Sequence, residues 1–266
     1  MPKQQKHFLM CPPTYFTVNY EINPWMDSKR FTDNPLARKQ WQTLHDAYLA
    51  AGHRISLIEP SPDWPDMVFA ANGATVVAGK AYGVKFAHAE RAGEAELYLE
   101  WFRRNGYQAV AATQTNEGEG DFLTIGKRIL AASGFRSSLE SHRELASVHN
   151  LEVVSLELVD PRFYHLDTAL AVLESDRVAY FPGAFSAESL GTLEELYPDA
   201  ILVSEEEAIW LALNATSDGE NVFVAAQAPK FAEELRRQGY NPIPIDVSEF
   251  LKGGGGIKCC TLEIRE

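Results

Sequence analysis

Hydrophobic residues change their spacing along the chain in a way that predicts alternating helices and strands. In some segments apolar residues recur every three or four positions, which is the spacing of one helix face, and several of these segments end at glycine. Between them lie short runs rich in Val, Ile and aromatic residues, which favour strands. The predicted helices span residues 35–51, 90–105, 137–149, 187–197, 205–213 and 229–238. The predicted strands span residues 53–58, 67–78 with a bend at Gly73, 107–111, 122–125, 129–133, 151–159, 168–173, 178–181, 201–203, 222–225, 240–245 and 257–264.

The order of these elements repeats along the chain. Helix–strand–strand units of roughly 50 residues occur five times, although their sequences barely match. This order predicts an α/β fold in which ββα-type units close into a radial array around a central funnel, rather than a doubly wound sheet. No linker interrupts the pattern, and the glycine tract 253–256 lies inside the last unit. We therefore expect residues 1–266 to form a single domain.

Composition narrows the classes of function. The 266 residues are 45% hydrophobic and 23% charged, as in ordinary globular proteins, and the net charge of −13 argues against a nucleic-acid partner. No apolar run approaches the roughly 20 residues of a membrane span, and the apolar run 8–11 is too short for a signal-peptide core. Cys11, Cys259 and Cys260 form no CxxC pair, so reduced thiols in a cytoplasmic protein fit best. A homo-oligomeric state is left open.

Unusual polar residues occupy equivalent strand ends in the repeat. Asn72 lies in unit one, Glu117 in unit two, His165 and Asp167 in unit three, and Cys259 in unit five. A radial array points equivalent strand ends at one axis. These side chains are therefore expected to meet in the central funnel.

Each candidate has an alternative interpretation. Four glycines precede Cys259 and would let backbone approach a ligand closely, but a buried free cysteine also packs as a small hydrophobe. Strand alternation is expected to turn Cys260 to the opposite face, toward the core. His165 alone is equally compatible with a surface or capping histidine. The carboxylates of loop 116–121 either bind a cation or form a solvated turn.

Together these segments resemble the guanidino-group-modifying enzymes, the pentein superfamily, over essentially the whole chain. The resemblance rests on segments 255–261 (Gly-Gly-Ile-Lys-Cys-Cys-Thr), 165–168 (His-Leu-Asp-Thr), 116–118 (Asn-Glu-Gly) and 65–72 (Pro-Asp-Met-Val-Phe-Ala-Ala-Asn). It implies a pentein α/β-propeller with Cys259 as nucleophile, His165 as proton donor and acceptor, and Glu117 as catalytic carboxylate. The spacing Glu-Gly-Glu-Gly-Asp departs from the Glu/Asp-Gly-Gly-Asp of many members and leaves Glu119 as an alternative to Glu117.

The same resemblance implies substrate-binding residues. Segments 90–94 and 134–138 are similar to dimethylargininase segments that bind a substrate carboxylate, which assigns that role to Arg91 and Arg136. Asp167 is expected to hold the guanidinium together with Glu117. The N-terminal loop is expected to cover the site, with Asn23 near the substrate.

Asn72 decides the expected reaction, because it stands where relatives usually carry aspartate. Its segment resembles arginine dihydrolase and succinylarginine dihydrolase, and a neutral amide can hold a neutral ureido group. We therefore place arginine dihydrolase first, with arginine converted to ornithine, carbon dioxide and ammonia. Dimethylargininase, which forms citrulline and dimethylamine from asymmetric dimethylarginine, and arginine deiminase are the alternatives. A non-catalytic arginine-binding module is a distant alternative, because it would need neither Cys259 nor His165. No metal or organic cofactor is expected, and the partner is a small-molecule substrate.

Overall fold

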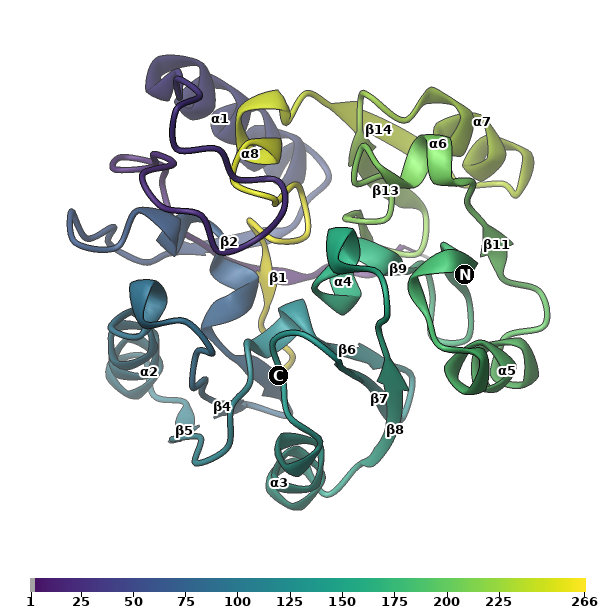
Figure 1. Ribbon diagram of the computed structural model, residues 1–266, viewed down its shortest axis with the longest axis horizontal. Coiled ribbons are helices and arrows are strands. Elements are labelled where there is room, and N and C mark those ends of the chain that lie inside the picture. Colours follow the sequence, from purple (N-terminus) through teal and green to yellow (C-terminus); the bar gives the residue numbers. More distant parts are fainter. Residues whose placement is uncertain (1–2) are drawn as a thin grey trace.

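Five three-stranded sheets surround one axis in the computed structural model, which describes residues 3–266 (Figure 1). This arrangement confirms the predicted α/β propeller. Four sheets follow each other along the chain: β3 (Thr75–Val77), β4 (Lys80–Tyr82) and β5 (Gln108–Val110); β6 (Phe122–Ile125), β7 (Arg128–Ser133) and β8 (Glu152–Glu157); β9 (Leu170–Val172), β10 (Val178–Tyr180) and β11 (Ile201–Leu202); and β12 (Thr216–Ser217), β13 (Asn221–Ala225) and β14 (Asn241–Ile245).

Each sheet combines one antiparallel strand pair with a parallel third strand, and one helix connects the middle strand to the parallel strand. These helices lie around the rim (Figure 1): α1 (Asn34–Ala50), α2 (Glu94–Arg104), α3 (Leu139–His149), α5 (Ala187–Leu196) and α7 (Pro229–Arg237). Gly52, Gly106 and Gly239 follow α1, α2 and α7 with φ of 84°, 84° and 92°, the left-handed backbone that commonly ends a helix. The helix-end glycines of the sequence therefore mark real boundaries.

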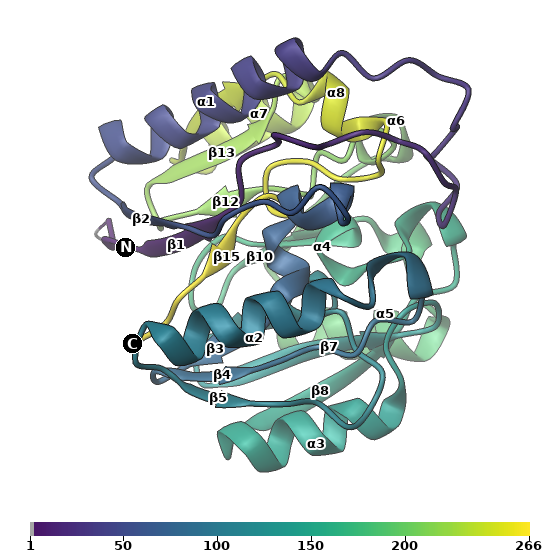
Figure 2. The ribbon, with the colours of Figure 1, turned by 90° about the vertical axis from the view of Figure 1, so that its left-hand side faces the viewer.

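The fifth sheet closes the ring by joining the two ends of the chain. It consists of β15 (Leu262–Glu263), β1 (His7–Met10) and β2 (Arg54–Leu57). Phe8 pairs antiparallel with Glu263 and parallel with Ile55. Both termini consequently lie at the same end of the propeller axis (Figure 2). The sequence pattern assigned no strand to residues 7–10 and therefore missed β1.

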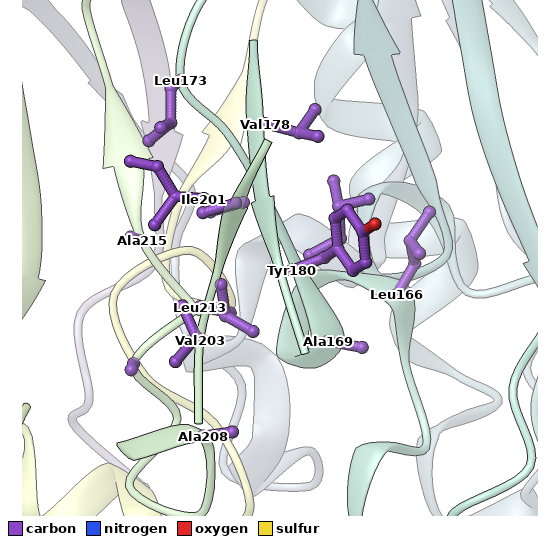
Figure 3. Close-up of a cluster of buried hydrophobic side chains, with 14 of the residues drawn as sticks. Leu166, Ala169, Leu173, Val178, Tyr180, Ile201, Val203, Ala208, Leu213 and Ala215 are labelled. Atoms are coloured by element: carbon purple, nitrogen blue, oxygen red, sulfur yellow. The ribbon is translucent and has the colours of Figure 1, made fainter. Parts of the chain in front are cut away.

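A buried hydrophobic cluster supports the third and fourth units (Figure 3). Val178 and Tyr180 of β10 point into it together with Leu166 and Ala169 of the short helix α4 (Leu166–Ala169). Leu213, which precedes β12, joins the same cluster. The packing therefore fixes the backbone on both sides of His165 and Asp167.

Two predicted strands are wrong, and both lie at the axis. Segment 67–78 contains the 3₁₀ turns Pro65–Val68 and Ala70–Gly73 and becomes a strand only at β3. Segment 257–264 is a strand only at Leu262–Glu263, because its backbone bonds locally, from Cys260 N to Gly256 O at 3.2 Å. The strand-alternation argument for Cys259 and Cys260 therefore fails, since neither residue lies on a strand.

The remaining differences concern short elements. The sequence pattern missed β4 and β12, and the predicted strand 168–173 begins within α4 and is a strand only at β9. The predicted helix 205–213 ends early as α6 (Glu205–Ala208), because Leu211 adopts a left-handed φ of 52°. The sequence pattern also missed α4 and α8 (Ser248–Leu251), each shorter than the window over which helical periodicity is visible. Within residues 3–266, no helix is long and apolar enough to cross a membrane.

Candidate active site

The structure brings the predicted polar residues of four units together at the axis. Asn72 precedes β3, Glu117 lies before β6, His165 and Asp167 flank the start of α4, and Cys259 precedes β15. None of these five residues is more than 2% exposed. They form one buried polar cluster at the axis.

Cys259 lies between a carboxylate and an amide. Its Sγ donates to Asp167 Oδ2 at 3.2 Å, and Asn214 Nδ2 lies 3.1 Å from the same sulfur. Burial raises the pKa of Cys259 well above its ordinary value, and the neighbouring Asp167 raises that pKa further. The resting sulfur is therefore a neutral thiol, and a cation beside Asp167 would favour the thiolate. Cys260 is fully buried, and both cysteines border the apolar cluster that contains Phe8, Phe69 and Phe223.

His165 is oriented by Glu117. Its Nε2 lies 2.8 Å from Glu117 Oε2, whereas Nδ1 is buried and has no hydrogen-bond partner within residues 3–266. A Cβ on Gly120 would lie 3.2 Å from Nδ1 and 2.3 Å from Asn72 Nδ2. Glycine at position 120 therefore lets the loop pass between the histidine and the amide.

Glu117 and Glu119 lie in different surroundings. Glu117 pairs with Arg136 at 2.9 Å, and although burial raises the pKa of Glu117, Arg136 and His165 outweigh it and hold that pKa far below its ordinary value. Glu119 pairs with Lys258 at 2.6 Å and with Arg265, away from His165. This geometry favours Glu117 as the catalytic carboxylate, a role that stays a prediction.

Arg91 is committed to the protein itself. Its Nε and Nη2 donate to Glu94 at 2.8 and 2.7 Å, and Nη1 donates to Asn72 Oδ1 at 2.7 Å. Asn72 Nδ2 in turn donates to Glu117 O at 3.1 Å. Arg136 donates from Nη1 to Glu117 and from Nη2 to Ile22 O at 2.7 Å. Binding of a substrate carboxylate by either arginine stays a prediction.

The N-terminal segment 11–33 lies over the cluster, at the end of the axis opposite the termini (Figure 2). Asn23 Nδ2 donates to Gly253 O at 3.1 Å, and Trp25 Nε1 donates to Arg162 O at 2.8 Å. Tyr20 donates to Asp66 Oδ2 at 2.8 Å. The predicted position of Asn23 beside the glycine tract is therefore observed, while its contact with substrate stays a prediction.

Three buried polar atoms at the cluster have no hydrogen-bond partner within residues 3–266. They are Asp66 Oδ1, Asp167 Oδ1 and His165 Nδ1. Burial raises the pKa of Asp66, and burial raises the pKa of Asp167 to about 7. Buried polar atoms are normally paired, and the two carboxylate oxygens can accept hydrogen bonds from N–H groups of a bound molecule.

Sequence reasoning missed Asn214, Asp66 and Tyr20. The repeat left unit four without a polar residue, and Asn214 fills that place just before β12, as Asn72 and Cys259 precede β3 and β15. A search for the missing member of the repeat would have found it. Within residues 3–266, no group of three or more His, Cys, Asp or Glu side chains is arranged to hold a metal ion.

Similarity to known proteins extends over nearly the whole chain. Residues 12–266 match the family model described as N,N dimethylarginine dimethylhydrolase, eukaryotic. A Mycobacterium tuberculosis protein named N(G),N(G)-dimethylarginine dimethylaminohydrolase is 49% identical over 259 residues, which cover 97% of this chain and 86% of that protein. A bifunctional arginine dihydrolase/ornithine cyclodeaminase of Synechocystis is 37% identical over 265 residues, which cover 97% of this chain and only 37% of that larger protein. The solved N-terminal domain of ArgZ, an arginine dihydrolase mutant bound to substrate, matches with a TM-score of 0.94 at 36% identity, over 98% of this chain and 99% of that domain.

Proposed function

The chain belongs to the N,N-dimethylarginine dimethylhydrolase family of the pentein superfamily, and from this premise we propose that it hydrolyses asymmetric dimethylarginine to citrulline and dimethylamine. At the coarser level it is a cysteine hydrolase that cuts guanidino C–N bonds. The order of substrates differs from the one expected from the sequence, because a relative named for dimethylarginine is 49% identical and the arginine dihydrolase is 37% identical.

The observation that supports a guanidinium substrate is the buried carboxylate oxygen of Asp167 that has no hydrogen-bond partner within residues 3–266. A guanidinium is a planar cation whose N–H groups point outward, and Asp167 Oδ1 is a buried acceptor beside the thiol. Glu117, which contacts His165 at 2.8 Å, supplies a second carboxylate. Binding of the cation would supply the missing donors and offset the cost of burying Asp167 as an anion.

The first chemical step forms a bond between Cys259 Sγ and the guanidino carbon. The thiol proton passes to His165, so that the sulfur attacks as a thiolate beside the bound cation. The tetrahedral adduct then breaks its bond to the dimethylated nitrogen, and His165 donates the proton to that leaving amine. An amidino-thioether on Cys259 and free dimethylamine result.

The second step removes the amidino group from sulfur. Neutral His165, held by Glu117 at 2.8 Å, takes a proton from water, and the resulting hydroxide attacks the amidino carbon. The C–S bond breaks, the thiol regains a proton from His165, and the neutral ureido product leaves with one proton released. No group outside the chain, substrate and water is required for this balance.

Asn72 is compatible with this substrate. The dimethylated nitrogen has no N–H to donate, so an anion facing it would gain no hydrogen bond. Asn72 is neutral, and its Oδ1 is already bonded to Arg91 at 2.7 Å.

For the other end of the substrate we propose Arg136 rather than Arg91 as the partner of the carboxylate, because all three nitrogens of Arg91 are used within the protein.

Arginine dihydrolysis is the second candidate, and Asn72 is the observation that favours it. A neutral amide can hold the neutral ureido group for a second attack, whereas an aspartate would prefer the cation. The 36% identical fold match to an arginine dihydrolase domain supports this alternative as well.

Product analysis separates the candidates. Purified protein is incubated separately with asymmetric dimethylarginine and arginine, and dimethylamine, citrulline, ornithine and ammonia are quantified by mass spectrometry, with Cys259→Ser as the inactive control. We expect equal amounts of citrulline and dimethylamine and a clear kcat/KM preference for dimethylarginine. Ornithine with two ammonia per arginine would instead establish dihydrolysis, and citrulline from arginine alone would establish a deiminase.

A further inference from the structure

We propose that Asn214 is a further catalytic residue, which fixes the backbone of Cys259 and donates a hydrogen bond to its thiolate. This inference rests on the proposed function, in which that thiolate is the nucleophile. Asn214 is 1% exposed, and one side chain makes both contacts: Oδ1 accepts from Cys259 N at 3.0 Å, and Nδ2 lies 3.1 Å from Sγ. Nδ2 also donates to Asp167 O at 3.0 Å.

The chain positions this amide with an unusual backbone turn. Leu211 adopts a left-handed φ of 52°, which a branched side chain rarely accepts outside functional or strained sites. The turn is closed by the bond from Asn214 N to Leu211 O at 3.0 Å, and Lys258 N donates to Asn214 O at 3.2 Å. Asn214 is thereby held on both its backbone and its side chain, and it joins unit four to the nucleophile segment of unit five.

The glycine tract leaves room for this contact. A Cβ on Gly256 would lie 3.0 Å from Asn214 Oδ1, which is tighter than ordinary contacts of real side chains. The amide therefore approaches the segment before Cys259 more closely than a larger residue at position 256 would allow. Glycine at position 256 therefore allows the side chain of Asn214 to reach Cys259.

The chemistry of the two neighbours of Sγ is opposite. Asp167 accepts a hydrogen bond from the neutral thiol and disfavours a second negative charge beside it. An amide nitrogen is a donor only, so Asn214 Nδ2 bonds more strongly to a thiolate than to a thiol. Once a guanidinium has bound at Asp167 and the thiol proton has passed to His165, the sulfur is an anion that keeps Asn214 as its donor. Asn214 consequently makes its largest contribution in the state that attacks the substrate.

The test measures the thiol directly, without substrate. Cys259 is alkylated with iodoacetamide over a range of pH in wild type, Asn214→Ala and Asn214→Asp, and the modified peptide is quantified by mass spectrometry. Loss of one hydrogen bond to a charged group should raise the midpoint of alkylation by about one to two pH units in Asn214→Ala. The aspartate keeps the acceptor for Cys259 N but replaces the donor with an anion, so the midpoint should rise further. It also preserves side-chain shape if the alanine variant does not fold.

The matched control is Asn221→Ala, which removes another buried amide, one that bonds Asp218 at 2.8 Å in β13. Its alkylation midpoint and kcat should equal those of wild type. In Asn214→Ala, kcat should fall about tenfold to a hundredfold with little change in KM. An unshifted midpoint in both Asn214 variants, or an equal shift in Asn221→Ala, would overturn the proposal. A shifted midpoint in a protein that cleaves neither substrate would support the role of Asn214 while refuting the proposed function.

Discussion

Glu117 and Glu119 belong to one loop but serve opposite ends of the propeller axis. Glu117 bonds His165 at 2.8 Å and Arg136 at 2.9 Å, beneath the N-terminal segment. Glu119 bonds Lys258 and Arg265, which line a cavity of about 340 Å³ together with Lys6 of the N-terminal region and Glu263 of β15. The same residue type two positions apart is therefore a candidate catalyst on one side and a structural anchor on the other.

The charges explain this difference. At the terminal end Glu119 and Glu263 meet Lys6, Lys258 and Arg265, and although burial raises the pKa of Glu263, these cations lower it to about 2. At the site end, burial raises the pKa of Asp121 to about 6 and that of Asp167 to about 7. At the terminal end, lysine and arginine side chains pair with the buried carboxylates. At the site end, buried carboxylates such as Asp167 have no such partner, and a cationic ligand would neutralise them. Buried carboxylates whose pKa is raised, such as Asp121 and Asp167, therefore mark the site more clearly than burial alone does.

Removing the nucleophile should have the largest effect. Cys259→Ser should reduce turnover to the background of the assay, because a serine hydroxyl without a matched base is a far weaker nucleophile. Cys260→Ser should keep most activity, since the sulfur that contacts Asp167 and Asn214 is that of Cys259. Steady-state kinetics and circular dichroism of both variants test this. Inactivity of Cys260→Ser with a fully active Cys259→Ser would reverse the assignment.

The two glutamates should separate activity from stability. Glu117→Gln should lower kcat by about 10²- to 10⁴-fold, the usual contribution of acid–base catalysis, because His165 loses its anionic partner. Glu119→Gln should leave kcat within a few-fold but reduce the free energy of unfolding by about 3–5 kcal/mol, because Lys258 and Arg265 lose a buried partner. Urea unfolding and kinetics of the same preparations test both. Identical losses in the two variants would remove the distinction between the ends.

Much of this architecture was predictable from the sequence, but the contacts at the axis were not. Helix-end glycines and apolar periodicity marked the rim helices, and the repeated order predicted the closed ring. The pattern failed at segments 67–78 and 257–264, where backbone groups bond within turns and apolar spacing carries no strand signal. Local pattern gave no physical reason for placing Glu117 ahead of Glu119, because both glutamates stand beside glycines and only their distant partners differ. Those partners lie in other units, beyond the reach of local sequence patterns.

The pH dependence of stability should differ in sign between the ends. Burial raises the pKa of Asp167 from its ordinary 3.8 to about 7, so the folded state binds its proton more tightly than the unfolded state. Wild type should therefore lose up to about 4 kcal/mol from this group as the pH rises from about 4 to 7, at 1.36 kcal/mol per pKa unit. Asp167→Asn should lack that loss. Glu263, whose pKa is lowered to about 2, stabilises the fold above about pH 4.5 and loses its contribution on acidification.

Urea titrations at a series of pH values give the difference in unfolding free energy between wild type and each variant. The Asp167→Asn difference should grow in favour of the variant as the pH rises. For Glu263→Gln the difference should grow in favour of wild type as the pH rises from about 2 to 4.5. Curves that run parallel to wild type in both variants would show that neither carboxylate is perturbed by folding.

The smallest predicted effect concerns the arginines of the two ends. Arg136 reaches Glu117 and Ile22 O, whereas Arg265 is locked between Glu119 and Glu263. Arg136→Lys keeps the charge but loses the planar fork, so KM for the amino-acid substrate should rise about tenfold to a hundredfold, the cost of one charge-assisted hydrogen bond of about 1.5–3 kcal/mol. Agmatine, which lacks the carboxylate, should be a poor substrate of wild type, and its kcat/KM should fall little further in Arg136→Lys.

The control is Arg265→Lys, which should leave KM unchanged and lower only the thermal midpoint. Because Arg136 also pairs with Glu117, an equal loss for both substrates would mean that the substitution acts through the catalytic carboxylate, and the assignment of Arg136 to the substrate carboxylate would be wrong.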